Sequence, residues 1–275
     1  MAGSKKATII VATHKKYRMP DDKLYLPLHV GAEGKFDAKG NPVDFGYQKD
    51  NTGENISLKN PKYCELTGMY WAYKNLDADY IGLVHYRRYF GGRRHSMEPF
   101  DSILTGKELA PMLDRYKVFV PVPQHYFIET LYSHYAHTHH EEHLDIVRHI
   151  ISEKCPSYLH VFDKVMRRTS GYMFNMMIME KRLFHRYCKW LFMILGELEK
   201  RVDDSCYDPF EARFYGRVSE IIFNVWLEYQ IEQKAIDRRQ IKKLPLVYME
   251  RINWIRKGNA FLRAKFFGEK YSNSF

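Results

Sequence analysis

The sequence has few cysteines, no long apolar run and fewer acidic than basic residues. Its four cysteines, in 275 residues, lie far apart, at positions 64, 155, 188 and 206. This spacing fits neither a disulfide framework nor a zinc ribbon, and a reducing compartment suits it best. The longest apolar stretch, residues 190–195, is far below the roughly 20 residues that span a bilayer. The apolar run at residues 7–12 is too short for a signal-peptide core, so we expect a cytoplasmic protein that contacts membranes only peripherally.

Four common catalytic or binding motifs are also missing. The sequence contains no Gly-x-x-x-x-Gly-Lys phosphate loop, no Gly-x-Gly-x-x-Gly after a strand and no Gly-x-Ser-x-Gly elbow. Residues 139–143 (His-His-Glu-Glu-His) do not form the His-Glu-x-x-His motif of zinc proteases, since His140 stands where the general base belongs. These absences argue against the enzyme classes that depend on those motifs.

The composition itself is that of a globular, aromatic-rich and basic protein. Hydrophobic residues make up 45% and charged residues 28%, which is enough for a substantial core and excludes disorder. Forty-three Lys and Arg against 33 Asp and Glu leave a net charge of +10. Such a surface attracts phosphates, nucleotides, nucleic acid or anionic lipid, and the charge alone does not choose among them.

The pattern along the chain predicts an α/β protein. Short continuous apolar runs, typical of strands buried on both faces, are expected to form strands at residues 7–13, 80–84, 116–122 and 172–179. Helices are expected at residues 62–75, 126–152, 181–202 and 219–233, the first of them opened by Asn60-Pro61. We therefore expect one domain over residues 1–240 and a basic, aromatic extension over residues 241–275.

The most distinctive local feature is the segment His85-Tyr86-Arg87-Arg88-Tyr89-Phe90, directly after a predicted buried strand. Open α/β sheets bind ligands at the carboxyl ends of their strands. Arginine forks suit phosphate oxygens and stay charged at any physiological pH. We interpret this segment as a phosphate-binding loop, with a solvated basic loop as the alternative. Asp77 and Asp79 precede the strand, so we expect an ordinary loop there rather than a metal site.

Seven of the 13 histidines fall between residues 125 and 149. Alternating His and Tyr side chains offer polar donors beside apolar stacking faces, which suits sugar rings. We therefore expect this segment to line a cleft. The alternative is a metal site in which His139 and His143 share one helical face.

A candidate general base, Glu220, lies early in a predicted helix that Ser219 would cap. Its structural alternative is a first-turn acid favoured by the helix dipole. The tail from Arg251 carries six cationic residues and one acid among six aromatic residues. It is expected either to dock on an anionic bilayer surface or to pack on the domain as a helix.

Several segments together resemble the bacterial capsular and exopolysaccharide glycosyltransferase family that has long been filed as a domain of unknown function. The resemblance is carried by residues 50–57 (Asp-Asn-Thr-Gly-Glu-Asn-Ile-Ser), 80–90, 172–179 and 216–226, and it extends over roughly residues 7–235. It implies a GT-A-like, Rossmann-type sheet flanked by helices, with the helical basic extension after it. It also implies that a nucleotide sugar binds at the sheet and that an adjacent cleft takes a growing glycan.

The resemblance also implies roles for particular residues. The nucleotide would lie near Thr13, His14, Lys15, Asp50, Asn51 and Tyr86. His85, Arg87 and Arg88 would stand where many GT-A enzymes keep a metal-binding aspartate pair, and Glu220 would be the base of an inverting enzyme. The strand at residues 172–179 would lie beneath the acceptor. We ourselves expect His139, His140, Asp145, Tyr172 and Asn175 to bind the acceptor, and His139, His140 and Asp145 are reserve candidates for the base.

The sequence lacks acidic residues at the end of the second predicted strand. We therefore expect Arg and His donors, rather than a divalent metal, to stabilise the departing diphosphate. The expected activity is transfer of a hexose, galactose or galactofuranose among them, from a UDP-sugar to a glycan or an undecaprenyl-type lipid-linked acceptor. Two alternatives stay open: a retaining transferase on the same scaffold, and a non-enzymatic module that binds nucleic acid or anionic surfaces.

Overall fold

The computed structural model describes residues 5–250, which divide into two compact units. The first, the sheet unit, comprises residues 5–122, 175–189 and 236–249. The second, the helical unit, comprises residues 123–174, 190–235 and 250. The second unit was not anticipated from the sequence, and the basic tail predicted from Arg251 onward lies outside the described residues.

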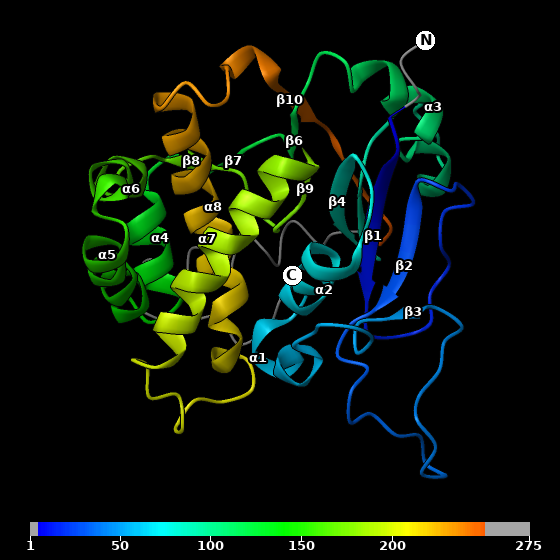
Figure 1. Cartoon of the computed structure of the whole chain (residues 1–275), viewed down its shortest axis with the longest axis horizontal. Helices are drawn as coiled ribbons and strands as arrows, with labels where there is room; N and C mark the ends of the chain where they lie inside the picture. Colours follow the sequence, from blue (N-terminus) through cyan, green and yellow to red (C-terminus); the bar gives the residue numbers. More distant parts are fainter. Residues whose placement is uncertain (1–4, 251–275) are drawn as a thin grey trace. The chain divides into compact units, whose positions relative to one another are not determined.

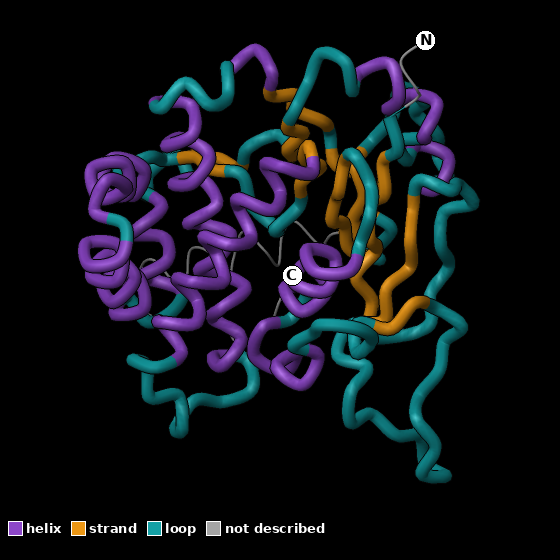
Figure 2. Tube along the Cα trace, viewed as in Figure 1, coloured by secondary structure: helices purple, strands orange, loops and turns teal. Residues whose placement is uncertain are grey.

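The sheet unit is built on a mixed, mainly parallel sheet in the order β10-β6-β9-β4-β1-β2-β3. Its central strands β1 (Ala7–Thr13) and β4 (Tyr80–His85) pair in parallel, as do β1 and β2 (Tyr25–His29). Both central strands are almost wholly buried, as their continuous apolar runs predict. Figures 1 and 2 show these strands lying side by side with the twist expected of such a sheet.

The outer strands complete this sheet. On one side β2 pairs in parallel with the short strand β3 (Gln48–Lys49). On the other side β9 (Met177–Glu180) runs antiparallel between β4 and β6 (Val118–Pro121), and β10 (Ile241–Leu244) pairs in parallel with β6. The sheet therefore continues past the boundary predicted at residue 240.

Two short helices connect β3 to β4, where the sequence predicts one. α1 (Asn60–Tyr63) and α2 (Leu66–Asn75) are separated at Cys64, whose φ is 52°. The Asn60 side chain stabilises this break by donating to the Cys64 carbonyl at 2.7 Å. In α2, a Cβ added at Gly68 would lie 2.9 Å from Val30 and 3.0 Å from Leu28. The glycine therefore permits close packing of the helix on the sheet.

The helical unit is formed around α8 (Phe214–Glu232), most of which is buried. It packs against α5 (Glu142–Lys154) and α6 (Leu159–Met166). The unit also contains α4 (Leu131–Thr138) and the residues of α7 (Lys181–Glu199) from 190 onward. A two-stranded ribbon, β7 (Gln124–His125) with β8 (Ser170–Gly171), completes it.

Two predicted elements are wrong in this region. The helix predicted over residues 126–152 is two helices, α4 and α5, preceded by a loop in which Phe127 has a φ of 55°. The strand predicted over 172–179 begins only at Met177, because Phe174 and Asn175 have φ values of 74° and 53°. Left-handed backbone of this kind cannot continue a strand.

The remaining elements are short. 3-10 turns occur at Ser57–Lys59, Pro99–Ser102, Ala110–Met112, Pro156–Tyr158, Glu211–Arg213 and Arg238–Gln240, and a one-turn helix, α3, at Gly106–Leu109. β5 (Arg88–Phe90) and β11 (Leu246–Tyr248) pair with each other beside β4. None of the helices in residues 5–250 has the length and the apolar character that crossing a bilayer requires.

Candidate functional site

The ends of β1 and β4 meet at the carboxyl edge of the sheet unit. Ala12 pairs with His85, and the Tyr86 amide donates to the Ala12 carbonyl at 3.2 Å. The loop that follows β1 therefore begins beside the turn that follows β4. This is the edge at which open α/β sheets bind ligands.

The charged segment after β4, expected from the sequence to be a loop, is a tight hairpin turn that leads into a further strand. His85 pairs with Arg88, so that Tyr86 and Arg87 form the turn into β5. Arg87 is exposed, whereas Arg88 is half-buried, with its guanidinium carbon 5.2 Å from the centre of the Tyr248 ring. The pairing of β5 with both β4 and β11 fixes the direction of these side chains.

Tyr86 is the centre of a group that we call the carboxyl-edge cluster: His14, Lys15, Tyr17, Tyr86 and Arg87. The rings of His14 and Tyr17 meet the buried Tyr86 ring edge-on, at centroid distances of 5.5 Å and 5.0 Å. The Lys15 ammonium lies 5.2 Å and the Arg87 guanidinium 5.5 Å from the same ring centre. A lysine, an arginine and a histidine side chain thus surround one aromatic ring, an arrangement that suits a pyrophosphate.

Thr13 shapes the loop that carries part of this cluster. Its buried hydroxyl donates to the Lys15 carbonyl at 2.6 Å and accepts from the Lys15 amide at 3.3 Å. Such a side-chain-to-backbone turn fixes the chain immediately after the strand. Thr13 is therefore placed to orient His14 and Lys15.

Asp50 and Asn51, predicted near the nucleotide, serve the framework instead. The fully buried Asp50 carboxylate accepts from the amides of Gly31 and Ala32 and from two hydroxyls, those of Ser57 and Thr67. Four internal donors satisfy a carboxylate, so we assign Asp50 to the packing of the chain between β2 and α2. The Asn51 amide donates to the Glu33 carboxylate at 2.9 Å.

The helical unit contains a separate cavity of about 160 Å³, which we call the helical-unit pocket. It is smaller than the roughly 300–1,000 Å³ typical of pockets for drug-sized ligands. Its polar lining residues are Gln124, Tyr126, His134, Tyr135, Thr138, His139, Arg217 and Glu220.

Glu220 lines this pocket from α8. The helix begins at Phe214, so Glu220 lies in its second turn rather than in its first. Ser219 is buried and donates to the Gly216 carbonyl at 2.8 Å, so it does not cap the helix as predicted. Glu220 is therefore not a first-turn acid placed at the helix end, and it lines the pocket from the side of α8.

His139 lines the pocket as a neutral imidazole. Burial, with the nearby Arg217 guanidinium as the next cause, lowers its pKa from 6.5 to about 2. Arg217 donates to His139 Nδ1 at 3.1 Å. The proton of the neutral ring therefore resides on Nε2, which makes His139 a hydrogen-bond donor.

Acidification should reduce the stability of the protein through His139. In the unfolded chain this imidazole takes up a proton below its ordinary pKa of 6.5, but in the folded protein it stays neutral down to about pH 2. Since the unfolded state binds more protons in this range, stability is lost as the pH falls below 6.5, by about 2 kcal/mol at about pH 5. Urea unfolding of the wild type and of His139→Gln, above pH 6.5 and at about pH 5, measures this loss of unfolding free energy. The variant should lack it. Equal losses in the two proteins would show that the folded ring takes up protons freely.

The other residues predicted to contact the acceptor do not line this pocket. His140 bonds to Glu211 at 2.9 Å, and Asp145 accepts from the Tyr132 hydroxyl at 2.9 Å. The backbone of Tyr172 is held by the Asn224 amide group. Asn175 belongs to the sheet unit, where it is buried and donates to Glu65 at 2.6 Å.

The alternative of a metal site at His139 and His143 is wrong. His139 ends α4 and His143 lies in α5, so one helical face does not carry both. Both nitrogens of the buried His143 are bonded at 2.9 Å to hydroxyls, those of Tyr135 and Tyr207. Within residues 5–250, no group of three or more His, Cys, Asp or Glu side chains is arranged to hold a metal ion.

Three polar residues of this region are absent from the predicted site residues: Glu129, Arg217 and His134, the last of which falls within the segment that we expect to line a cleft. Glu129 is 3% exposed and bonds to His134, which lines the pocket. The capping signal Thr130-x-x-Ser133 could have separated Glu129 from the helix predicted around it. Arg217 lies three residues before Glu220. Helical spacing places both side chains on the same face once α8 is known to begin at Phe214.

A further cavity of about 690 Å³ lies in the sheet unit, at the amino edge of the sheet. Lys5, Tyr80 and Lys117 line it from the starts of β1, β4 and β6. This is the edge opposite the carboxyl-edge cluster. Since ligands of open α/β sheets bind at the carboxyl edge, we assign no part of the site to this cavity.

Comparison with known proteins identifies the family of this chain. Residues 8–232 match the family model described as Domain of unknown function (DUF4422). The chain belongs to this family. Family membership alone does not name an activity, and no curated protein matches the chain.

The fold of this chain is similar to that of a solved structure. It is titled "WbbM bifunctional glycosytransferase apo structure" and superposes with a TM-score of 0.79 at 26% sequence identity. The match covers 90% of this chain but only 46% of the other. The α/β fold with its mixed, mainly parallel sheet is therefore similar to that of a glycosyltransferase, and the chain spans less than half the length of that protein.

Proposed function

We propose that this protein is a glycosyltransferase that moves a hexose from a nucleotide sugar to a glycan or lipid-linked acceptor. The observation that carries the proposal is the carboxyl-edge cluster, where the ends of β1 and β4 gather Lys15, Arg87 and His14 around Tyr86. The cluster lies on a fold that superposes on a glycosyltransferase. The similarity in fold supports the class of activity by analogy, and the cluster supplies the chemistry.

The sheet unit would bind the donor. A sugar that leaves on a diphosphate develops negative charge on the departing oxygens, and preorganised cationic donors stabilise that charge. Arg87 and Arg88 on the rigid hairpin, with His85 at the end of β4, are the groups we assign to this task. UDP is the nucleotide that we propose for the donor, with galactose or galactofuranose as the sugar.

The helical unit would bind the acceptor in its pocket. There Glu220 would take the proton of an acceptor hydroxyl as the oxygen forms its bond to the anomeric carbon. The bond from that carbon to the diphosphate breaks at the same time, and the nucleoside diphosphate leaves with the bonding electrons. A single displacement of this kind inverts the anomeric configuration.

Binding of UDP tests the proposal directly. A ligand that binds only the native state raises stability with its concentration, so UDP should raise Tm by a few degrees at saturation. Inorganic phosphate at the same ionic strength is the control. A polynucleotide-binding module would instead bind RNA or DNA with a steep dependence on salt. Absence of any UDP effect together with such salt-sensitive binding would contradict the proposal.

A further inference from the structure

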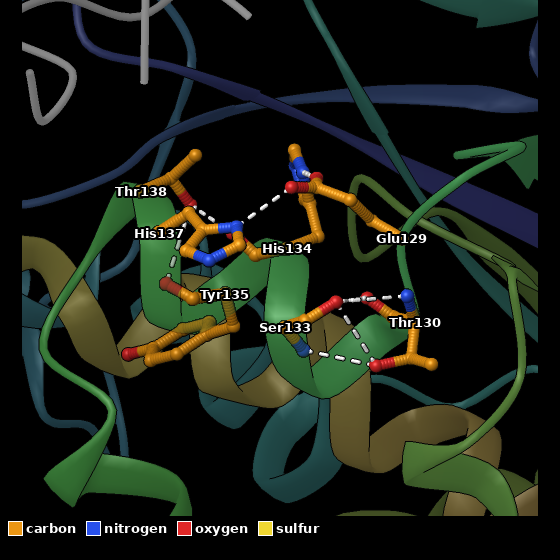
Figure 3. Close-up of polar contacts among 7 residues, drawn as sticks. All are labelled: Glu129, Thr130, Ser133, His134, Tyr135, His137 and Thr138. Carbon is orange, nitrogen blue, oxygen red and sulfur yellow. Dashed lines mark hydrogen bonds and ion pairs between the residues drawn. The ribbon is translucent and has the colours of Figure 1, made fainter. Parts of the chain in front are cut away.

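Glu129 is a buried carboxylate that orients two histidines of one helix. It lies between β7 and α4 and is 3% exposed. Its Oε2 bonds to His134 Nδ1 at 2.8 Å and its Oε1 to His137 Nδ1 at 2.7 Å (Figure 3). The two histidines are three residues apart on α4 and so share a face. One carboxylate thus fixes both rings.

The chain next to Glu129 is held by a capping box. The Thr130 hydroxyl accepts from the Ser133 amide at 3.0 Å, and the Thr130 amide donates to the Ser133 hydroxyl at 2.9 Å (Figure 3). This reciprocal pair fixes the start of α4 relative to the preceding residue. The carboxylate is therefore preorganised and does not depend on a mobile loop.

The bonds to Glu129 determine which ring nitrogen carries the proton. Burial raises the pKa of Glu129, but the hydrogen bonds to His137 and His134 lower it by more. The pKa of Glu129 therefore lies below its ordinary value. An ionised carboxylate can only accept hydrogen bonds. Each Nδ1 must therefore carry a proton, and the lone pair of each neutral ring belongs to Nε2.

The two histidines differ in their surroundings. His134 lines the helical-unit pocket and stacks on Tyr126 at a centroid distance of 4.0 Å. The side chain of His137 is 45% exposed, and it does not line the pocket. The same carboxylate thus serves one ring in the pocket and one at the surface.

The pocket therefore contains two imidazoles of opposite hydrogen-bonding character. In its neutral form His134 is an acceptor through Nε2, because Glu129 holds the proton on Nδ1. His139 is a donor through Nε2, because Arg217 donates to its Nδ1. A sugar hydroxyl both donates and accepts one bond, and neighbouring hydroxyls on a ring can use an acceptor and a donor together.

We propose that Glu129 is a positioning residue that presents His134 as a hydrogen-bond acceptor to a hydroxyl of the acceptor sugar. This inference rests on the proposed function, because it places the acceptor in this pocket. The proposed ligand is a neutral sugar ring with adjacent hydroxyls. One hydroxyl would donate to His134, and its neighbour would accept from His139. Glu220 remains the group that takes the proton.

The test of positioning uses ¹⁵N spectra of the histidine rings, which report the tautomer without any substrate. In the wild type and in His137→Gln, His134 should show the tautomer with the proton on Nδ1. In Glu129→Gln the amide supplies a donor as well as an acceptor, so at least one ring must change its tautomer. Glu129→Asp, which keeps an acceptor-only group, should retain part of the original signal. A His134 proton on Nε2 in the wild type would overturn the proposal.

The test of ligand binding follows the same rings while methyl β-D-galactopyranoside is added. The His134 signals should shift saturably in the wild type and in His137→Gln. The apparent Kd should rise about tenfold in Glu129→Gln and in His134→Gln, where the His139 signals report binding. A tenfold rise is the loss of affinity expected when one hydrogen bond is removed. Equal affinities in Glu129→Gln and His137→Gln, or no response at His134 in the wild type, would overturn the assignment. Neither test needs turnover, so a failure of the proposed glycosyl transfer would be recognised separately, by the absence of UDP binding.

Discussion

Glu220→Gln should retain its fold but lose about two to four orders of magnitude in kcat, the usual cost of removing a general base. The amide has nearly the shape of the carboxylate and cannot accept the proton of the attacking hydroxyl. The residue lines the helical-unit pocket from the second turn of α8. Because the substitution removes an interaction made in the transition state, KM for the acceptor should change little.

Glu232→Gln is the matched control, since it makes the same chemical change on the same helix. Glu232 bonds to Lys164 at 2.7 Å and to His160 at 2.9 Å and does not line the pocket. Its variant should keep kcat within about twofold. Near wild-type turnover in folded Glu220→Gln would remove Glu220 from the mechanism. His139, the one reserve candidate that lines the pocket, would not replace it, because its Nδ1 accepts from Arg217 and its pKa is lowered to about 2.

The central sheet could be predicted from the sequence because its strands carry their own signal. β1 and β4 are short, continuous apolar runs, a pattern that fits strands buried on both faces. Their carboxyl ends could be predicted to meet for the same reason, since parallel neighbours end at the same edge. Thr13, His14, Lys15 and the hairpin residues after β4 therefore emerge together, as expected.

The helical unit was harder to predict because its breaks depend on tertiary contacts. Residues 126–152 have apolar positions at helical spacing, yet the chain turns at Phe127 and again at His139. Glu129 is buried there, and its carboxylate meets two imidazoles. An acid with a helical pattern around it gives no sign in the sequence that its carboxylate will be buried.

Asp50 shows the converse failure. A polar residue in a Gly- and Asn-rich loop is expected to be exposed and to serve a ligand. In the structure it is fully buried and accepts hydrogen bonds from the backbone after β2 and from hydroxyls of the following turn and helix. The donors at Gly31, Ala32 and Thr67 lie 17 to 19 positions away along the chain, and Ser57 lies 7 positions away. Only the folded chain brings them to one carboxylate.

Arg87→Ala should lower kcat by about two to three orders of magnitude, the typical effect of removing one preorganised donor to a developing oxyanion. Arg87 is exposed on the turn between β4 and β5, with its guanidinium carbon 5.5 Å from the centre of the Tyr86 ring. Its loss should therefore leave the fold intact. UDP should bind more weakly too, although by less than the fall in kcat, because the charge on the diphosphate grows as the sugar leaves.

Arg115→Ala provides a closely matched control. Arg115 is also exposed, and like Arg87 it lies over the ring of a neighbouring tyrosine in the sequence. Its guanidinium carbon is 5.2 Å from the centre of the Tyr116 ring. It precedes β6, at the amino edge of the same sheet. The two variants remove the same charge from the same unit, so a general effect of net charge would lower both activities equally. A loss confined to Arg87→Ala would locate the effect at the carboxyl edge.

Chelation separates the two ways in which the leaving diphosphate can be stabilised. If Arg87 and its neighbours supply the positive charge, EDTA should leave the turnover of the purified wild type unchanged. If EDTA abolished activity and Mn²⁺ restored it, a bound cation would hold the diphosphate, and Arg87→Ala should then cost far less than a hundredfold. The two measurements constrain each other, because the charge that develops on one leaving group is stabilised either mainly by the guanidinium or mainly by the metal.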